Sequence, residues 1–522
     1  MKVLNIIYAM LLGCLLVSCA EDLGNYSYHE LIEPEISGVE ADLSALTFSR
    51  LQLTPDLGEN EFSESAYSFE WKAISMDAGT VTVIGQERNL DYEVQLPEGS
   101  YKLFFTVTEK ASGVYWQQSY NLQVNQATSE GWMVLCSVNG KTRLDMKSEV
   151  TGEIYFDLLK NSGLPEWNGP RKIQQLNAEV SETDSPFYLL TDEGATRLGK
   201  NGFEWKEEYS LRYEMANGQD PFPHEILEMG VGKVMVSGTD FYFADCMGIA
   251  GLYGSPVNKN FRVAPQIGTN VATTMIMVPV ALMYDTDNKR FVGYSPNLAS
   301  EDLGNFSSLH ELNELGRLAD EFYLTGKNKA GVIGTAFDEF PEGLDFVYME
   351  NTRYDPGNGK MGVTYTVLAD GDKRYLYGIQ LGDMLTFADC SAALGKAYYG
   401  DISNCTRIAQ VTDLFAFSSL KNYMYYAVGN SVYRVDLSVL PLKAERQFSL
   451  NGETITCLKF NLYQNSQNAA KSYDLVVGSE KNGEGILRIY EGLESEGDFK
   501  KVKPVVYSGF GHIVDATYRE NE

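Results

Sequence analysis

Hydrophobic and polar residues alternate over short stretches through the first part of the chain. In residues 67–74 (YSFEWKAI), Phe69 and Trp71 fall on one side of an extended strand and polar residues on the other. Residues 96–109 (LPEGSYKLFFTVTE) and 112–124 (SGVYWQQSYNLQV) repeat this alternation after turn residues. The pattern predicts short antiparallel strands joined by hairpins.

A lone tryptophan between small sheets of such strands is typical of an immunoglobulin-like sandwich. We therefore predict an Ig/PKD-like β-sandwich over residues 36–126, with Trp71 in its core rather than on a ligand-binding surface. The polar, turn-rich segment 125–131 (NQATSEG) is the predicted linker to the next domain.

After this linker the alternation changes to recurrent hairpins. Each consists of a strand, a turn rich in Asn, Asp or Gly, and a second strand. There are seven, at residues 132–146, 186–199, 233–245, 280–294, 365–381, 423–437 and 473–491. Repetition at this period predicts a β-propeller-like domain of about seven blades over residues 131–522, with uneven spacing that leaves the blade count open. Residues 504–518 (PVVYSGFGHIVDATY) would supply the strand that closes the ring.

Composition agrees with an all-β chain. Its 522 residues include 33 Tyr, 25 Phe and 48 Gly, and the length favours two or more domains. The formal net charge of −29 disfavours nucleic acid and anionic lipid headgroups as partners.

The amino terminus has the features of a bacterial lipoprotein signal. Lys2 precedes an apolar run, residues 3–17, that is too short for a comfortable transmembrane helix. The run ends at Leu16-Val17-Ser18-Cys19, which resembles a lipobox. We predict a signal peptide over residues 1–18, lipidation of Cys19, and a tether over residues 19–35.

The residues after Cys19 resemble a known family. The matching positions are Cys19, Glu21, Asp22, Gly24, Asn25, Tyr26 and Tyr28, followed by a Gly-Trp-x-Val-Leu strand within residues 130–146. This pattern is similar to the PKD-like lipoproteins of Bacteroidetes. The resemblance implies display on the outer membrane, with the acid after Cys19 as a surface-export signal. It also implies an association with SusC/SusD-type nutrient importers, and no catalytic residues.

Motifs for common chemistries fail on their spacing. Asn139-Gly140-Lys141-Thr142 lacks the upstream glycine of a phosphate loop and is predicted to be a hairpin turn. Residues 230–235 and 509–514 lack the third glycine of a dinucleotide fingerprint. None of the four histidines forms HExxH, and no GxSxG is present, which excludes those protease and hydrolase classes.

The seven cysteines show no CxxC or zinc-ligand spacing. Cys14 would leave with the signal peptide and Cys19 would carry lipid. The remaining five, Cys136, Cys246, Cys390, Cys405 and Cys457, are expected to be isolated buried thiols, with one disulfide as the alternative.

Two kinds of residue are weak candidates for binding. Trp167 and Trp205 lie in loop-like segments where flat rings could stack on sugars, although packing in the core or between blades is the favoured explanation. The acidic pairs Asp285/Asp287 and Asp370/Asp372 could bind calcium, but the same residues favour hairpin turns. We predict no catalytic residue and no required cofactor.

The first functional hypothesis is a non-enzymatic surface lipoprotein that binds a glycan, a peptide or a partner protein during polysaccharide uptake. The first alternative is a propeller-fold glycan-cleaving enzyme, a lyase or hydrolase that uses carboxylates. The second alternative is a structural subunit of a SusC/SusD-type complex. The side chains at the mouth of the propeller channel should discriminate between them.

The anchor can be tested directly. Replacing Cys19 by Ala removes the thiol that would carry the lipid, so the protein is expected to move from the membrane fraction to the soluble fraction. Fractionation followed by immunoblotting measures this, with Cys14→Ala as the matched control because that thiol lies within the predicted signal. Retention of the Cys19→Ala protein in the membrane would contradict lipidation.

Overall fold

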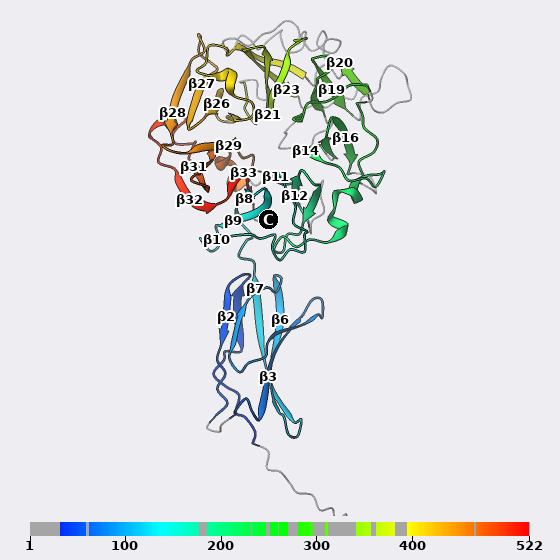
Figure 1. Ribbon diagram of the computed structural model, residues 1–522, viewed down its shortest axis with the longest axis vertical. Coiled ribbons are helices and arrows are strands. Elements are labelled where there is room, and N and C mark those ends of the chain that lie inside the picture. Colours follow the sequence, from blue (N-terminus) through cyan, green and yellow to red (C-terminus); the bar gives the residue numbers. More distant parts are fainter. Residues whose placement is uncertain are drawn as a thin grey trace, which may run out of the picture. The chain divides into compact units, whose positions relative to one another are not determined.

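The computed structural model describes residues 32–58, 62–176, 185–230, 232–246, 251–258, 260–269, 280–295, 308–311, 341–356, 362–381, 394–463 and 466–520. Cys19 and the predicted signal peptide lie outside these residues. The chain divides into two compact units (Figure 1). Unit 1 comprises residues 1–45, 49–94 and 99–124, and unit 2 comprises residues 46–48, 95–98 and 125–522.

Unit 1 is the predicted sandwich. One sheet has five strands in the order β1–β7–β6–β3–β4, and β2 pairs with β5 in a second, smaller sheet. The strands are β1 (Asp42–Leu46), β2 (Arg50–Leu53), β3 (Tyr67–Ser75), β4 (Val81–Gly85), β5 (Leu90–Glu93), β6 (Gly99–Glu109) and β7 (Tyr115–Asn125).

Trp71 lies in the core of this unit, as predicted. It is 0% exposed, and its ring centroid is 4.5 Å from that of Phe105. Its indole nitrogen donates to the carbonyl of Glu87 at 3.2 Å. The buried ring therefore keeps a hydrogen-bond partner, which a buried Trp N–H requires.

The described residues of unit 2 form seven antiparallel sheets. Blade 1 contains β33 (His512–Arg519), β8 (Gly131–Val138), β9 (Lys141–Ser148) and β10 (Ile154–Tyr155). Blade 2 contains β11 (Pro170–Gln175), β12 (Phe187–Thr191) and β13 (Ala195–Leu198). Blade 3 contains β14 (Pro223–Met229), β15 (Gly232–Ser237) and β16 (Asp240–Asp245). Blade 4 contains β17 (Gly268–Thr269), β18 (Ala281–Asp285), β19 (Arg290–Ser295) and β20 (Ser308–Glu311).

The remaining three blades each have four strands. Blade 5 contains β21 (Asp345–Asn351), β22 (Val363–Asp370), β23 (Lys373–Leu381) and β24 (Leu394–Asp401). Blade 6 contains β25 (Phe415–Phe417), β26 (Tyr423–Val428), β27 (Ser431–Asp436) and β28 (Ala444–Ser449). Blade 7 contains β29 (Thr454–Phe460), β30 (Leu475–Lys481), β31 (Glu484–Tyr490) and β32 (Val505–Phe510).

Short 3₁₀ helices interrupt the loops. They are η1 (Glu207–Tyr209), η2 (Leu211–Glu214), η5 (Ile408–Gln410), η6 (Ser466–Tyr473) and η7 (Phe499–Lys501). No helix among the residues described above is both long and apolar enough to cross a membrane.

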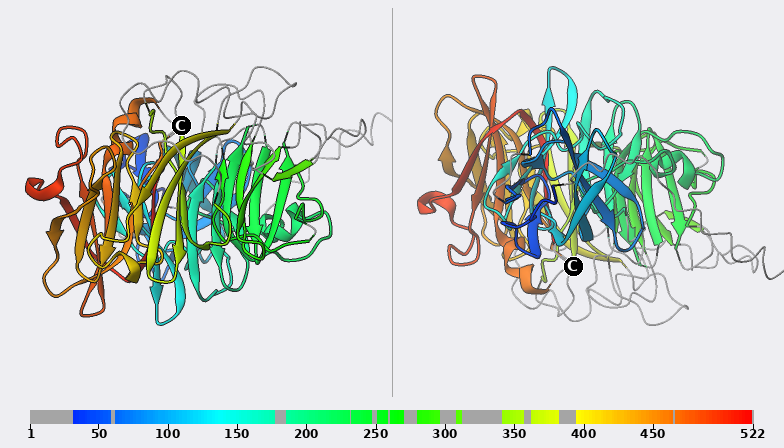
Figure 2. Two further views of the ribbon diagram at one scale, coloured as in Figure 1. Left: turned by 90° about the horizontal axis from the view of Figure 1, so that it is seen from above. Right: turned by 90° about the horizontal axis from the view of Figure 1, so that it is seen from below.

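The seven sheets form a propeller. Strands β33, β11, β14, β17, β21, β25 and β29 each adjoin the next in this order around one axis, so they are the innermost strands (Figure 1). Figure 2 shows the same sheets from two further directions. The all-β prediction is confirmed. The number of blades, which the sequence left open, is seven over the described residues.

Each predicted hairpin is the second and third strand of one blade. For example, β8 pairs with β9 and β22 pairs with β23. The turn at Asn139-Gly140 has positive φ at both residues, 53° and 83°, which is the conformation of a tight hairpin turn. The hairpin interpretation of this stretch is confirmed, and the phosphate-loop alternative is excluded.

Apolar side chains fill the wedges between neighbouring blades. Seven hydrophobic clusters each draw residues from two adjacent blades. The cluster between blades 7 and 1, for example, includes Trp132, Val476 and Ile513, all at most 5% exposed. Removing this apolar area from water stabilises the ring at about 25 cal/mol per Å².

The ring closes between distant parts of the sequence. β33 pairs antiparallel with β8, with Ala516 opposite Val134 and Tyr518 opposite Trp132. Blade 1 thus takes its innermost strand from the end of the chain and its other three strands from residues 131–155. The predicted closing strand is confirmed.

Removal of β33 should prevent the propeller from folding. A chain ending at Gly511 loses the β8 pairing and the burial of Ile513, Ala516 and Tyr518. Since a domain has only about 5–15 kcal/mol of stability, we expect no cooperative thermal transition for the propeller. A chain ending at Glu520 keeps all of β33 and is the control; calorimetric transitions of equal area in both would contradict the closure.

Candidate functional site

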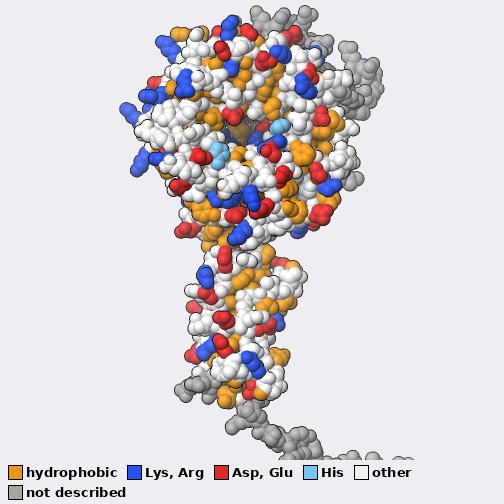
Figure 3. All heavy atoms as spheres, viewed as in Figure 1, with side chains coloured by type: hydrophobic (Ala, Val, Ile, Leu, Met, Phe, Trp, Pro, Cys, Tyr) orange, Lys and Arg blue, Asp and Glu red, His pale blue; other side chains and the backbone are white. Residues whose placement is uncertain are grey.

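The innermost strands enclose a channel whose wall carries charged residues. Lys172 lies on β11, Glu225 on β14, Glu350 on β21, Lys459 on β29 and Asp515 on β33. Figure 3 shows a hollow in the middle of the ring of blades, with acidic, basic and histidine side chains at its edge. The channel is therefore the first place to look for chemistry.

β-bulges set the direction of several of these side chains. Register shifts fall immediately before Lys172 on β11, Glu225 on β14, Tyr348 on β21, Cys457 on β29 and Asp515 on β33. A bulge inserts one residue and turns the following side chain. The bulge recurs within the first three residues of five innermost strands. We call the charged channel residues Lys172, Glu225, Glu350, Lys459 and Asp515 the charged ring.

The carboxylates of this ring link one blade to the next. Asp515 pairs with Lys459 at 2.8 Å and accepts from the main-chain N–H of Ile173 at 3.1 Å. Glu225 pairs with Lys172 and accepts from the N–H of Ile267 at 3.1 Å. Each of these two carboxylates therefore connects three successive blades, which is a structural role.

Glu350 has a different environment. It accepts from the Tyr348 hydroxyl at 3.1 Å and from the N–H of Phe417 at 3.5 Å, and no cation pairs with it directly among the described residues. Protein surrounds the carboxyl, although part of the residue touches the channel, and this burial raises its pKa to about 8. Burial likewise raises the pKa of Tyr348.

We call one side of the propeller the turn face. It carries the turn between the second and third strands of each blade and the first residues of each innermost strand. The two meet because the strands are antiparallel: Pro223, at the start of β14, pairs with Ser237, at the end of β15.

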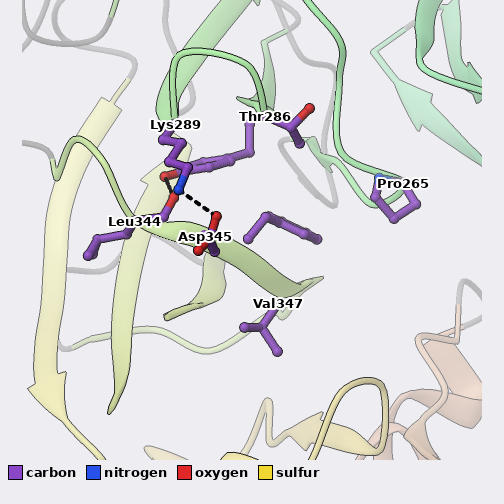
Figure 4. A pocket seen from close by; sticks show the side chains of 8 residues that line it. Pro265, Thr286, Lys289, Leu344, Asp345 and Val347 are labelled. Carbon is purple, nitrogen blue, oxygen red and sulfur yellow. Dashed lines mark hydrogen bonds and ion pairs between the residues drawn. The ribbon is translucent and has the colours of Figure 1, made fainter. Parts of the chain in front are cut away.

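A pocket of about 410 Å³ opens on the turn face between blades 4 and 5. Lys289 lies in the β18–β19 turn and pairs with Asp345 of β21 at 2.8 Å (Figure 4). The Tyr284 hydroxyl donates to the carbonyl of Leu344 at 2.7 Å. The complete lining is Pro265, Tyr284, Thr286, Lys289, Leu344, Asp345, Phe346 and Val347.

This pocket combines an apolar wall with a polar rim. Phe346 and Val347 are partly accessible, and the Phe346 ring lies 5.8 Å from that of Tyr284. The Lys289–Asp345 pair and the Thr286 hydroxyl supply donors and acceptors beside it. Such a mixture suits a ligand with one apolar face and several hydroxyl or amide groups.

Of the two predicted tryptophans, one reaches the turn face. Trp167 is half-buried and lies against Gly194 in the β12–β13 turn. Trp205 packs against the cluster between blades 1 and 2, and its indole nitrogen donates to the Thr196 hydroxyl at 2.8 Å. The two rings have different neighbours, and ligand binding by either remains a prediction.

The first pair of candidate calcium ligands, Asp285 and Asp287, makes hydrogen bonds and ion pairs at a hairpin turn. The Asp285 carboxylate accepts from the N–H groups of Asp287 and Asn288 at 3.0 Å and pairs with Arg290. Asp287 pairs with Arg262 at 2.6 Å. These contacts match the turn interpretation.

The second acidic pair also lies at a turn: Asp370 ends β22, and Asp372 follows it in the exposed β22–β23 turn. Over the described ranges, no group of three or more His, Cys, Asp or Glu side chains could hold a metal ion.

Four of the five predicted thiols are described, and Cys136, Cys405 and Cys457 are free. Burial raises the pKa of Cys136 and Cys457 to about 12 and that of Cys405 to about 11. Such thiols stay protonated and unreactive at neutral pH. Cys246 is only partly buried, and Cys390 lies outside the described residues.

The channel residues were absent from the sequence-based candidates. A weak signal existed: Pro170-Arg171-Lys172-Ile173 and Pro223-His224-Glu225-Ile226 share a Pro-x-charged-Ile pattern, and both begin innermost strands. A repeat of a charged residue at this spacing would have pointed to Lys172 and Glu225.

The chain resembles known proteins only at a coarse level. A model of the PKD-like family matches residues 19–172. No curated protein matches the chain.

Among solved structures, a quinonprotein alcohol dehydrogenase-like protein from Bacteroides thetaiotaomicron covers 92% of this chain and 96% of its own, at 12% identity and a TM-score of 0.47. The WD40 domain of SCAP from fission yeast covers 65% of this chain and 74% of its own, at 7% identity and a TM-score of 0.30. A Bacteroides ovatus mixed-linkage glucan locus protein, SGBP-B, in complex with a mixed-linkage heptasaccharide, covers 54% of this chain and 68% of its own, at 10% identity and a TM-score of 0.15.

Scores this low assign no function. The family match supports the PKD-like prediction made from the opening motif and extends through the sandwich into the first strands of the propeller. The match therefore covers the amino-terminal part of the chain.

Proposed function

We propose that this protein is a non-enzymatic binding protein that captures a glycan or peptide on the turn face of its propeller. In this proposal, lipid on Cys19 holds the protein at the surface of the outer membrane, where it assists a SusC/SusD-type importer. The observation that carries the binding function is the pocket between blades 4 and 5, with its apolar wall and its Lys289–Asp345 rim.

The size and lining of the pocket support this proposal. Its 410 Å³ lies within the roughly 300–1,000 Å³ common for small-molecule sites. Phe346 offers an aromatic surface to the C–H face of a sugar ring or to an apolar peptide side chain. Because Lys289 and Asp345 hold each other in place, their remaining donor and acceptor sites are already oriented for a ligand.

The channel carboxylates support binding over catalysis. Glycosidases need two carboxyl groups, one to donate a proton and one to act as base or nucleophile. Asp515 and Glu225 are each held by a lysine and a main-chain N–H of a neighbouring blade. Neither carboxylate can move to a substrate without breaking the links between blades.

Glu350 is the one observation that favours the glycan-cleaving alternative. A carboxyl group with a pKa near 8 stays protonated at neutral pH and could act as a general acid. That alternative requires a second carboxylate free to act with it. Turnover of any glycan by the wild-type protein, abolished in Glu350→Gln, would establish the enzyme and overturn the binding proposal.

Phe346→Ala should weaken ligand binding. The substitution removes the accessible aromatic wall of the pocket, so the dissociation constant is expected to rise by about tenfold or more, which corresponds to about 1.4 kcal/mol. Calorimetric titration with panels of oligosaccharides and peptides measures this, with turnover assayed in parallel. Tyr213→Ala, which removes a 50% exposed ring in η2, is the control. Equal affinity in wild type and Phe346→Ala would exclude this pocket as the site.

Glu350→Gln should change how stability depends on pH. The folded-state pKa of about 8 exceeds the ordinary value of 4.5, so the folded chain holds an extra proton between these values. The free energy of unfolding of the wild type therefore falls as pH rises through this window, by at most about 1.4 kcal/mol per pH unit.

Gln stays neutral and should remove this part of the slope. Urea unfolding of both proteins across the window measures the difference, with the exposed-turn variant Glu484→Gln as control. Parallel curves for wild type and Glu350→Gln would show that the carboxyl is not held protonated.

A further inference from the structure

The turn face carries aromatic and polar side chains at the equivalent position on blade 2. In blade 4 the pocket is built from the β18–β19 turn, the start of its own innermost strand, and the start of the innermost strand of blade 5. In blade 2 the corresponding parts are the β12–β13 turn at residues 192–194, the start of β11, and the start of β14. We call this second place the blade 2 strip; its residues are Trp167, Asn168, Arg171, Asp192, Glu193 and Phe222.

Contacts join these six residues into one surface. Trp167 lies against Gly194, which follows Glu193 in the turn. Asn168 donates to both oxygens of Glu193, from its main-chain N–H at 2.9 Å and from its side-chain amide at 2.7 Å. Arg171 pairs with Asp192 at 2.7 Å and donates to the carbonyl of Phe222 at 3.3 Å. The strip therefore runs without interruption from Trp167 to Phe222.

The strip presents aromatic rings at both ends and oriented polar groups between them. Phe222 is 43% exposed, and Trp167 is half-buried. The two hydrogen bonds from Asn168 lower the pKa of Glu193, so this carboxylate remains an ionised acceptor. Stacking surfaces beside fixed acceptors are the groups that recognise a polyhydroxylated ring.

Charge selects the class of glycan. In the blade 2 strip, Asp192 already pairs with the cation Arg171, and in the blade 4/5 pocket, Asp345 already pairs with Lys289. The whole chain carries a net charge of −29, which repels a polyanion. Among the described residues of the strip and the pocket, a uronate-rich or sulfated chain would therefore find no unpaired cation, whereas a neutral glycan needs none.

We infer that the ligand is a neutral polysaccharide chain that lies across the turn face and occupies the blade 2 strip and the blade 4/5 pocket together. This inference rests on the proposed binding function and adds the substrate class and a second subsite. Linking two weak subsites through one polymer raises the overall affinity, because binding at the second becomes intramolecular.

The test compares ligand lengths across matched variants. Neutral polysaccharides (a β-glucan, a mannan, a galactan and starch) and their disaccharides are titrated against wild type, Trp167→Ala, Phe222→Ala, Phe346→Ala and the Tyr213→Ala control. Chondroitin sulfate and polygalacturonate are the anionic comparators. Thermal unfolding verifies folding of each variant, and Phe222→Ala, at an exposed position, keeps the test valid if Trp167→Ala does not fold.

We expect one neutral polymer to bind the wild type. Its affinity should fall by about tenfold or more in each strip variant and also in Phe346→Ala. The affinity for a disaccharide should change only with substitutions in the strip or only with the substitution in the pocket. If Phe346→Ala lowers the affinity for the polymer and both strip variants leave that affinity unchanged, the strip is not a second subsite and the proposed function stands. Tighter binding of an anionic chain overturns the substrate class. If no glycan binds, this inference fails, and the proposed function then depends on the peptide panel alone.

Discussion

The pairing of β33 with β8 is the constraint on which the propeller depends. The blades bury their apolar faces against one another, so a ring open between blades 7 and 1 would expose the two faces that pack together there. The hydrogen bonds between β33 and β8 and the packing of Ile513 against blade 7 remove that exposure. The other blades then form a rigid support for the turns that carry the blade 2 strip and the blade 4/5 pocket.

The charged ring in the channel reinforces the same closure from inside. Asp515 is on the closing strand itself, and it joins Lys459 of blade 7 to the main chain of blade 2. Buried ion pairs add little net stability compared with apolar packing, but removal of one partner is costly. These contacts therefore specify which blades are neighbours and at what height.

The sequence predicted the parts of the fold that depend on local patterning. The second and third strands of each blade alternate strongly and are joined by Asn, Asp or Gly turns, so all seven hairpins were found. Of the innermost strands, β33 was predicted as the closing strand. Others such as β11 (PRKIQQ) and β14 (PHEILEM) were missed because they face a channel and carry charges where a buried strand would carry apolar residues.

The candidate site was less predictable. Pro265, Lys289 and Phe346 meet only because blades 4 and 5 are adjacent, and no local pattern records this. Trp167 and Trp205 looked alike in the sequence. In the structure Trp167 lies against Gly194 and Trp205 donates to the Thr196 hydroxyl, and neither contact could be read from the local pattern around the ring.

The origin of blade 1 from two distant parts of the chain has a consequence for how the protein is made. During synthesis β8, β9 and β10 emerge before any other blade, yet the inner edge of β8 has no partner until residues 512–519 follow. An unpaired strand edge readily joins other strands. The nascent propeller must therefore be kept apart from its neighbours until translation reaches β33, and ring closure is bound to be a late event in its biogenesis.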